Sequence, residues 1–166
     1  MRNLNTFGQR FSIFLAVLVT VLLLFCFMTG CERFETPVSN AGVITRGGVD
    51  FSLTLRRSEL PLGDTLSGSF TVMNRSGAVQ RFNFRTSCQL GLRLSSNERI
   101  WIELPEMCAQ VLTSFELRPS ESRTIVFQLP LRHHRTGEFL PHGDYALEAF
   151  LLDDNSPVLR QSVRVQ

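Results

Sequence analysis

The sequence lacks the motifs that carry the chemistry of several common enzyme classes. It contains no Gly-x-Ser-x-Gly elbow, no glycine-rich phosphate loop and no His-Glu-x-x-His pair. No acid, base and nucleophile are grouped along the chain in a way that suggests one reaction. These absences predict a protein that is not an enzyme and that carries neither a cofactor nor a catalytic metal.

The sequence also lacks any sustained helical stripe of apolar residues. Short runs instead alternate apolar and polar residues, as half-buried β-strands do. Turn residues separate these runs at intervals of roughly ten residues. The candidate strands are residues 49–55, 65–74, 80–88, 91–94, 100–104, 111–117, 123–129, 145–152 and 158–165. We therefore predict an all-β fold, an antiparallel immunoglobulin-like β-sandwich of seven to nine strands.

The first thirty residues have the composition of a secretory signal. Arg2 and Arg10 supply positive charge, and residues 11–28 form an uncharged, apolar run. A helix of this length reaches roughly 27 Å, slightly less than the ~30 Å hydrocarbon core of a bilayer. Length alone therefore leaves two alternatives open, a cleaved signal and a retained signal anchor.

Residues 28–31, Met-Thr-Gly-Cys, favour cleavage. They resemble a bacterial lipobox, in which the signal is cut between Gly30 and Cys31, the Cys31 thiol receives diacylglycerol and the new amino terminus is acylated, typically with palmitate. Cys26 follows the bulky Phe25 and is a poorer candidate. A chance Gly-Cys pair after a signal anchor is the alternative. We expect a lipoprotein anchored to a membrane of the bacterial cell envelope.

Cleavage before Cys31 changes the charge balance. It removes two of the 17 basic residues, all of which are arginine, and none of the 15 acidic ones, so the mature chain has a net charge of zero. A nucleic-acid partner is not expected, because proteins that bind phosphate backbones carry a basic surplus. Residues 31–48 contain three glycines and Pro37 but few large apolar residues, and they are predicted to be a lipidated, flexible tether. Residues 49–166 form the predicted domain.

Two cysteines remain in the predicted domain, Cys88 and Cys108. An even pair in an oxidising compartment favours a disulfide, which would close a loop of ~20 residues and stabilise the fold by roughly 3 kcal/mol. Free buried thiols or a metal site are the alternatives. The sequence offers no Cys-x-x-Cys or Cys-x-x-His spacing near them, which makes metal binding the weaker alternative.

Tyr145 follows a Gly-Asp turn, Gly143-Asp144, and begins a long apolar strand. This position suits a tyrosine corner, in which the hydroxyl group binds nearby backbone. An ordinary half-buried tyrosine is the alternative.

The segment 131–144, LRHHRTGEFLPHGD, is the densest polar stretch. Its histidines raise the question of a metal site, but the flanking arginines would oppose a cation. Exposed loops of sandwich domains commonly carry binding contacts. The candidate binding residues are Arg132, His133, His134, Arg135, Phe139 and His142.

Residues 53–152 resemble the BsuPI-type domain, a family named after an intracellular proteinase inhibitor of Bacillus. The matching positions are Asn74-Arg75-Ser76, Phe82, Phe84, Trp101, residues 117–122 (Leu-Arg-Pro-Ser-Glu-Ser) and residues 141–145 (Pro-His-Gly-Asp-Tyr). Most are turn and core positions, so the resemblance implies structural roles for Trp101, Pro119, Gly143 and Tyr145. Ser120 stands where the family usually has Gly.

We derive three functional hypotheses. The first is a non-enzymatic module that binds an unknown envelope protein. The second is an inhibitor of an envelope or secreted protease, in which the loop from Arg132 to His142 enters the active-site cleft in extended form and Arg132 or Arg135 fills a trypsin-like primary pocket. The third and weakest is a small hydrolase or metal-dependent enzyme.

Overall fold

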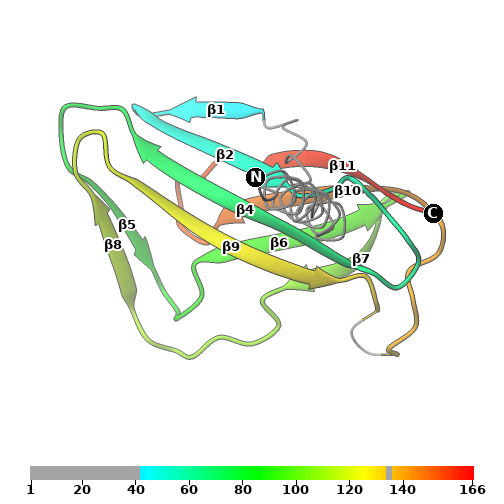
Figure 1. Ribbon diagram of the computed structural model, residues 1–166. Coiled ribbons are helices and arrows are strands. Elements are labelled where there is room, and N and C mark those ends of the chain that lie inside the picture. Colours follow the sequence, from blue (N-terminus) through cyan, green and yellow to red (C-terminus); the bar gives the residue numbers. More distant parts are fainter. Residues whose placement is uncertain (1–41, 134–135) are drawn as a thin grey trace, which may run out of the picture. The chain divides into compact units, whose positions relative to one another are not determined.

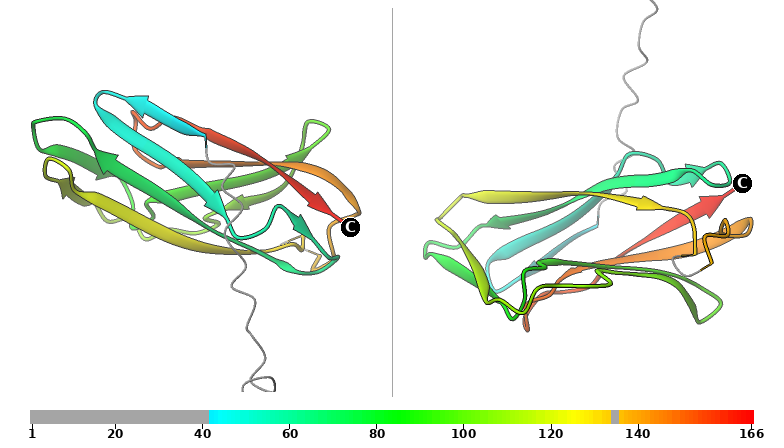
Figure 2. Two further views of the ribbon diagram at one scale, coloured as in Figure 1. Left: turned by 45° about the horizontal axis from the view of Figure 1, so that its top comes forward. Right: turned by 90° about the horizontal axis from the view of Figure 1, so that it is seen from below.

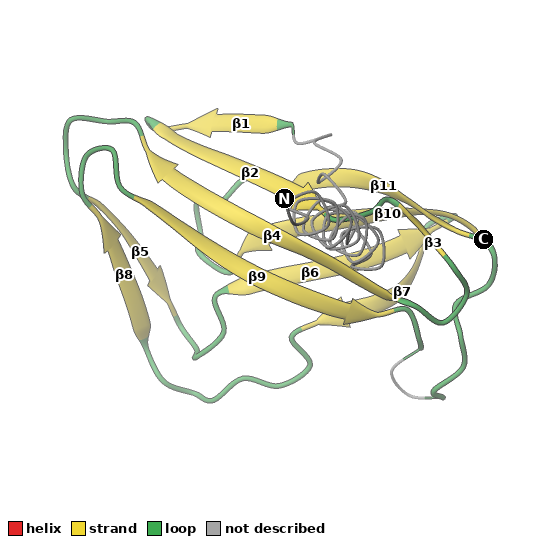
Figure 3. Cartoon of the chain, viewed as in Figure 1, coloured by secondary structure: helices red, strands yellow, loops and turns green. Residues whose placement is uncertain are grey.

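The computed structural model describes residues 42–133 and 136–166. All regular elements in this part of the chain are β-strands (Figures 1 and 3). They are β1 Val43–Arg46, β2 Val49–Leu55, β3 Glu59–Leu60, β4 Thr65–Asn74, β5 Gln80–Phe84, β6 Leu90–Ser96, β7 Arg99–Leu104, β8 Thr113–Leu117, β9 Ser122–Pro130, β10 Gly143–Leu151 and β11 Leu159–Val165. The predicted all-β class is confirmed. Nowhere in the described ranges does a helix occur that could span a membrane.

The strands form two facing sheets and one small sheet. Sheet A has the order β1-β2-β4-β9, sheet B has the order β3-β11-β10-β6-β7, and β5 pairs with β8. All pairs are antiparallel except the short pair of β3 with β11. The order β2-β4-β9 facing β11-β10-β6-β7 corresponds to the A-B-E and G-F-C-C′ arrangement of immunoglobulin-like sandwiches. Figure 2 shows the two layers edge-on.

The core lies between sheets A and B because side chains alternate across each strand. In β4 every second residue is buried, and Phe70 and Val72 are completely covered. Leu94 of β6 and Leu147 of β10 are equally buried on the opposing sheet. The rings of Phe82 on β5 and Phe115 on β8 stack with centroids 4.8 Å apart and extend the core into the small sheet.

Strand β1 corrects the predicted start of the domain. Residues 43–46 were expected to belong to the tether, but they pair with β2 in a register that sets Arg46 opposite Val49. Gly47 and Gly48 have φ angles of +60° and +77° and form the two-residue turn of this hairpin. The Gly-Gly pair is therefore a hairpin turn and not a linker signal. With β1 and the two-residue β3, the strand count rises to eleven, above the predicted seven to nine.

The outer face of sheet B carries alternating charges. Glu148 of β10 lies opposite both Arg93 of β6 and Arg160 of β11, and Arg93 lies opposite Glu103 of β7. Arg93 binds Glu103 at 2.7 Å and Glu148 at 3.3 Å, and Arg160 also binds Glu148. Hydrogen bonding to Glu103 raises the pKa of the Arg93 guanidinium. We call this row the charge ladder.

The outer face of sheet A is different, because hydroxyl side chains dominate it. Ser52 and Thr54 of β2 pair with Thr71 and Ser69 of β4. Thr71 also pairs with Thr124 of β9, and their hydroxyl oxygens are 2.9 Å apart.

Candidate functional site

The predicted binding loop connects β9 to β10 and begins as a hairpin. Leu131 and Leu140 are buried at its base. The Leu131 N–H donates to the Asp64 carbonyl at 3.0 Å, and the Leu140 N–H donates to the Leu131 carbonyl at 3.1 Å. The base of the hairpin is thus bonded to the turn before β4 and is closed on itself.

Arg132 and Phe139 face each other above this base. They form an antiparallel bridge, and the Arg132 guanidinium lies 4.5 Å from the centroid of the Phe139 ring. The ring covers Gly63, where an added Cβ would lie 2.5 Å from a ring carbon. Phe139 nevertheless remains about half exposed. These two predicted binding residues therefore form a cation–π pair on a fixed stem.

His133 and Glu138 continue the hairpin beyond Arg132 and Phe139. The His133 N–H donates to the Glu138 carbonyl, and the Gly137 N–H donates to the His133 carbonyl, both at 2.8 Å. His134 and Arg135 lie outside the described residues. The expectation that the loop is extended from Arg132 to His142 is wrong, because backbone pairing of residues 131–133 with residues 137–140 folds the segment back on itself.

Tyr145 forms the predicted tyrosine corner. Tyr145 lies near the start of β10, and its hydroxyl group donates to the carbonyl of Pro141, four residues upstream, at 2.7 Å. The side chain is buried, and burial raises the pKa of the phenol above its ordinary value. The bond fixes the end of the loop against the strand that follows it.

A surface groove of about 510 Å³ lies beside this corner. Trp101 of β7 meets Tyr145 edge-on with ring centroids 6.3 Å apart, and the Arg99 guanidinium lies 4.0 Å from the Trp101 ring centroid. The groove is lined by Ser96, Asn97, Arg99, Trp101, Pro141, His142, Gly143, Asp144 and Tyr145. We call it the Trp101 groove.

The structure brings together only some of the predicted residues. Trp101, His142, Gly143 and Tyr145 meet at the Trp101 groove. Arg132, His133 and Phe139 belong to the neighbouring hairpin. Arg99 was missed, although its place two residues before Trp101 on a strand would have indicated a shared face. Within residues 42–133 and 136–166, no three His, Cys, Asp or Glu side chains are grouped to hold a metal ion.

Asn74 lies at the other end of the sandwich and is completely buried. Its amide group donates to the carbonyls of Ala78 and Leu117 at 2.7 and 2.9 Å. Its side-chain oxygen accepts from the Ser76 N–H and hydroxyl group at 2.9 and 2.7 Å. Every polar group of the side chain is used, which assigns the Asn-Arg-Ser sequence a structural role.

The turn that contains Pro119 adjoins Asn74. The Ser120 N–H donates to the Asn74 carbonyl, and the Glu121 N–H donates to the Arg118 carbonyl. Ser120 has a φ angle of +66°, a conformation that favours glycine. Pro119 thus lies in a hydrogen-bonded turn beside Asn74, at the opposite end of the sandwich from the Trp101 groove.

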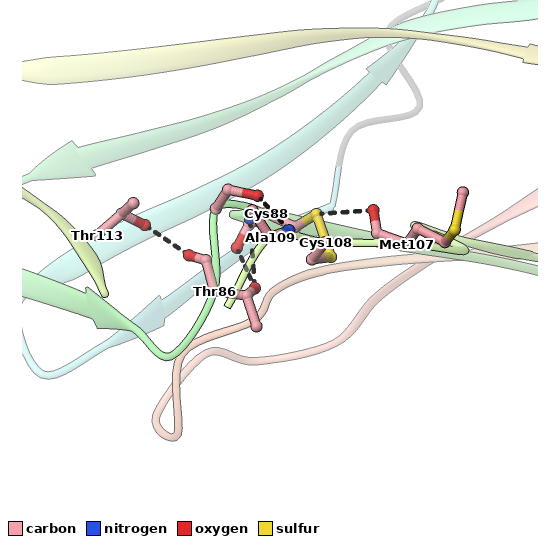
Figure 4. Close-up of a disulfide and its surroundings, with 7 residues drawn as sticks. Thr86, Cys88, Met107, Cys108, Ala109 and Thr113 are labelled. Atoms are coloured by element: carbon pink, nitrogen blue, oxygen red, sulfur yellow. Dashed lines mark hydrogen bonds between the residues drawn. A yellow bond between two sulfur atoms is a disulfide. The ribbon is translucent and has the colours of Figure 1, made fainter. Parts of the chain in front are cut away.

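Cys88 and Cys108 form a disulfide with Cα atoms 5.6 Å apart (Figure 4). It joins the connection between β5 and β6 to the connection between β7 and β8. The Ser87 N–H donates to the Ala109 carbonyl, and the Thr113 hydroxyl group donates to the Thr86 carbonyl. Both connections that lead to the small sheet are thus fixed to each other.

A search of solved structures finds matches to parts of longer chains. A β-glucosidase from Erythrobacter marinus is 15% identical to the chain with a TM-score of 0.47, and the match covers 71% of this chain and 15% of that one. A β-glucosidase from Listeria innocua is 17% identical with a TM-score of 0.44, and the match covers 76% of this chain and 16% of that one. The sporulation control protein Spo0M from Bacillus subtilis is 16% identical with a TM-score of 0.46, and the match covers 73% of this chain and 50% of that one. The matched region is thus half or less of each of these structures.

A search of curated protein sequences gives no match. The sequence pattern of one family, described as "BsuPI: Intracellular proteinase inhibitor", matches residues 53–156. This range covers more than half of the chain and extends from β2 to the connection before β11. It confirms the resemblance seen in the turn and core motifs. The chain belongs to the BsuPI family of intracellular proteinase inhibitors.

Proposed function

We propose that this chain is a non-enzymatic protein-binding module of the bacterial cell envelope, anchored by lipid at Cys31. Its contact surface consists of the β9–β10 hairpin and the neighbouring Trp101 groove. The observation that carries the proposal is the fixed hairpin stem, which holds the half-exposed Phe139 ring against Arg132. A pre-ordered aromatic and arginine pair loses little conformational entropy on binding, and both residue types are common at interface hot spots.

Site-specific photo-crosslinking in intact cells tests the protein-binding role. A photoreactive amino acid replaces Phe139, or Val158 as a matched control. Val158 is equally exposed and lies between β10 and β11, beyond the other end of β10. We expect one protein adduct from position 139 and none from position 158. Equal labelling at both positions, or labelling at neither, contradicts the proposal.

The lipid anchor is tested by the intact mass of the chain extracted from membranes with detergent. We expect the mass of residues 31–166 plus acyl groups. The unmodified mass of residues 1–166 would instead indicate a retained signal anchor and would remove Cys31 from the proposed function.

Protease inhibition is the second candidate, and the family match favours it. In this case the hairpin tip would enter the active-site cleft, with Arg132 or Arg135 in a trypsin-like pocket. We expect dose-dependent, stoichiometric loss of trypsin-like activity that Arg135→Ala or Arg132→Ala abolishes. Hydrolysis of the chain as an ordinary substrate, without inhibition, would exclude this role.

A further inference from the structure

Strand β9 is an edge of sheet A. It pairs with β4 along its full length and has no strand on its other side among the described residues. Figure 2 shows β9 as the outermost ribbon of its layer. An edge strand presents backbone N–H and C=O groups that can pair with another chain.

Two hydrogen bonds at the ends of the β4–β9 ladder show which β9 backbone groups point outward. The Asn74 N–H donates to the Glu121 carbonyl, and the Leu131 N–H donates to the Asp64 carbonyl. Bonded pairs recur at every second residue of an antiparallel ladder, so the odd-numbered residues of β9 bond to β4. The backbone groups that point away from β4 are those of Ser122, Thr124, Val126 and Gln128.

The other edges of the two sheets carry features that prevent edge pairing, whereas β9 has such features only near its ends, at Arg123 and Pro130. β7 carries Arg99 and Glu103 and contains a register shift opposite β6. β3 has two residues, and β1 has four and ends at Arg46. Residues 124–129 of β9, Thr-Ile-Val-Phe-Gln-Leu, contain no charge, glycine or proline. Such a run has high strand propensity and none of the usual features that prevent edge pairing.

We propose that β9 pairs antiparallel with β9 of a second copy of this chain, about a two-fold axis through Val126. Val126 is the central residue of β9 and is 75% exposed. In this register the outward N–H groups of Thr124, Val126 and Gln128 each meet an outward carbonyl of the second copy. The result is one continuous sheet that crosses both domains.

The side chains of β9 are symmetric in character about Val126, which is why a second copy fits better than an unrelated strand. On the outer face, Thr124 meets Gln128 of the second copy, and the two Val126 side chains cover each other. On the inner face, Ile125 meets Phe127 of the second copy. An isologous interface of this kind brings no like charges together, because Arg123 lies opposite Leu129 of the second copy.

Thiol crosslinking of the full-length chain in its membrane tests this register. Val126→Cys places two thiols at the axis, whereas Gln128→Cys places each thiol opposite Thr124 of the other copy. With a short bismaleimide, we expect a covalent dimer from V126C that exceeds the dimer from Q128C, and the chain without an added cysteine sets the background. Equal dimer yields, or a V126C adduct with a different protein and no dimer, overturn the proposal.

A second variant acts on the backbone alone. Val126→Pro removes an N–H that points away from β4, so the bonds to β4 remain, and proline is tolerated at such edge positions. We expect the detergent-solubilised chain to sediment as a dimer and V126P to sediment as a monomer, with V126T as the matched control that stays dimeric. Dimers in both variants, or monomers in all three chains, contradict pairing through β9.

Discussion

The two ends of the sandwich use polar side chains in opposite ways. At one end Asn74 is completely buried, and four hydrogen bonds tie it to the turns on either side. At the other end Tyr145 makes one hydrogen bond to Pro141, and the polar groups around it line the open Trp101 groove. The Asn74 end is closed to ligands, and the Tyr145 end offers an accessible surface.

The difference separates an end where family motifs are closed off and specify the fold from an end where family positions, Trp101 and residues 141–145, also border an accessible surface. The Asn-Arg-Ser and Leu-Arg-Pro-Ser-Glu-Ser motifs lie at the Asn74 end, where substitutions should act on stability. The hairpin and Arg99 lie at the Tyr145 end, where substitutions should act on binding. Five predictions test this separation.

Asn74→Ala has the largest expected effect. It removes the side-chain donor to the Leu117 carbonyl and the acceptor of the Ser76 N–H, whereas the Ala78 carbonyl keeps the Ser76 hydroxyl group as a donor. We expect a loss of about 4 kcal/mol in the free energy of unfolding, since each unsatisfied buried group costs about 1–3 kcal/mol. Urea denaturation followed by Trp101 fluorescence measures it. Asn83→Ala, at an exposed site on β5, should change stability by less than about 0.5 kcal/mol; similar losses in both variants would contradict the assignment.

Removal of the disulfide ranks second. It should reduce the free energy of unfolding by about 3 kcal/mol, because the unfolded chain regains the freedom of the closed loop. Comparing Cys88→Ser/Cys108→Ser with the oxidised chain, in urea, gives the value directly. No difference between the two would mean that the bonds from Ser87 and Thr113 are enough to hold these connections.

Tyr145→Phe tests the other end and should cost only about 1 kcal/mol, the net value of one hydrogen bond. The Trp101 groove keeps its aromatic lining in this variant. A loss comparable to that of Asn74→Ala would show that the two ends are not different in the way described above.

The same tyrosine predicts an alkaline transition. Tyr145 is the single tyrosine of the chain, so absorbance of tyrosinate at 295 nm reports it alone. Burial raises its pKa in the folded protein, and the unfolded chain therefore releases its proton first. Stability should be constant below pH about 10 and fall as the pH rises from there through the folded-state pKa. A folded-state midpoint at or below that of the urea-unfolded chain would contradict this.

Ser120→Gly has the smallest expected effect and the opposite sign. The φ angle of +66° at Ser120 is unfavourable for a residue with a Cβ atom. Glycine should raise the free energy of unfolding by roughly 0.5–1 kcal/mol. Urea midpoints of the two chains, measured side by side, test it. A lower midpoint for the glycine variant would mean that flexibility gained in the unfolded chain outweighs the strain removed.

Local pattern was enough to predict the features that depend on local residues. The strands followed from alternation, and the tyrosine corner followed from a Gly-Asp turn before an apolar strand. The disulfide followed from an even cysteine count. By contrast, Gly47-Gly48 has the same composition in a linker and in a hairpin turn, and only pairing with β2 distinguishes them. The Arg132 and Phe139 contact depends on hairpin register, which composition does not encode, whereas the spacing of Arg99 and Trp101 on one strand was available in the sequence.

The charge ladder has a consequence for the speed of recognition. Glu148 and Glu103 alternate with Arg93 and Arg160 across sheet B, so their fields cancel within a few ångströms of the surface. Such a face cannot attract a charged partner from a distance. Association through this face should then proceed at an unsteered rate of about 10⁵–10⁶ M⁻¹s⁻¹ and should change little with salt. Once contact is made, shape and apolar contacts select the partner.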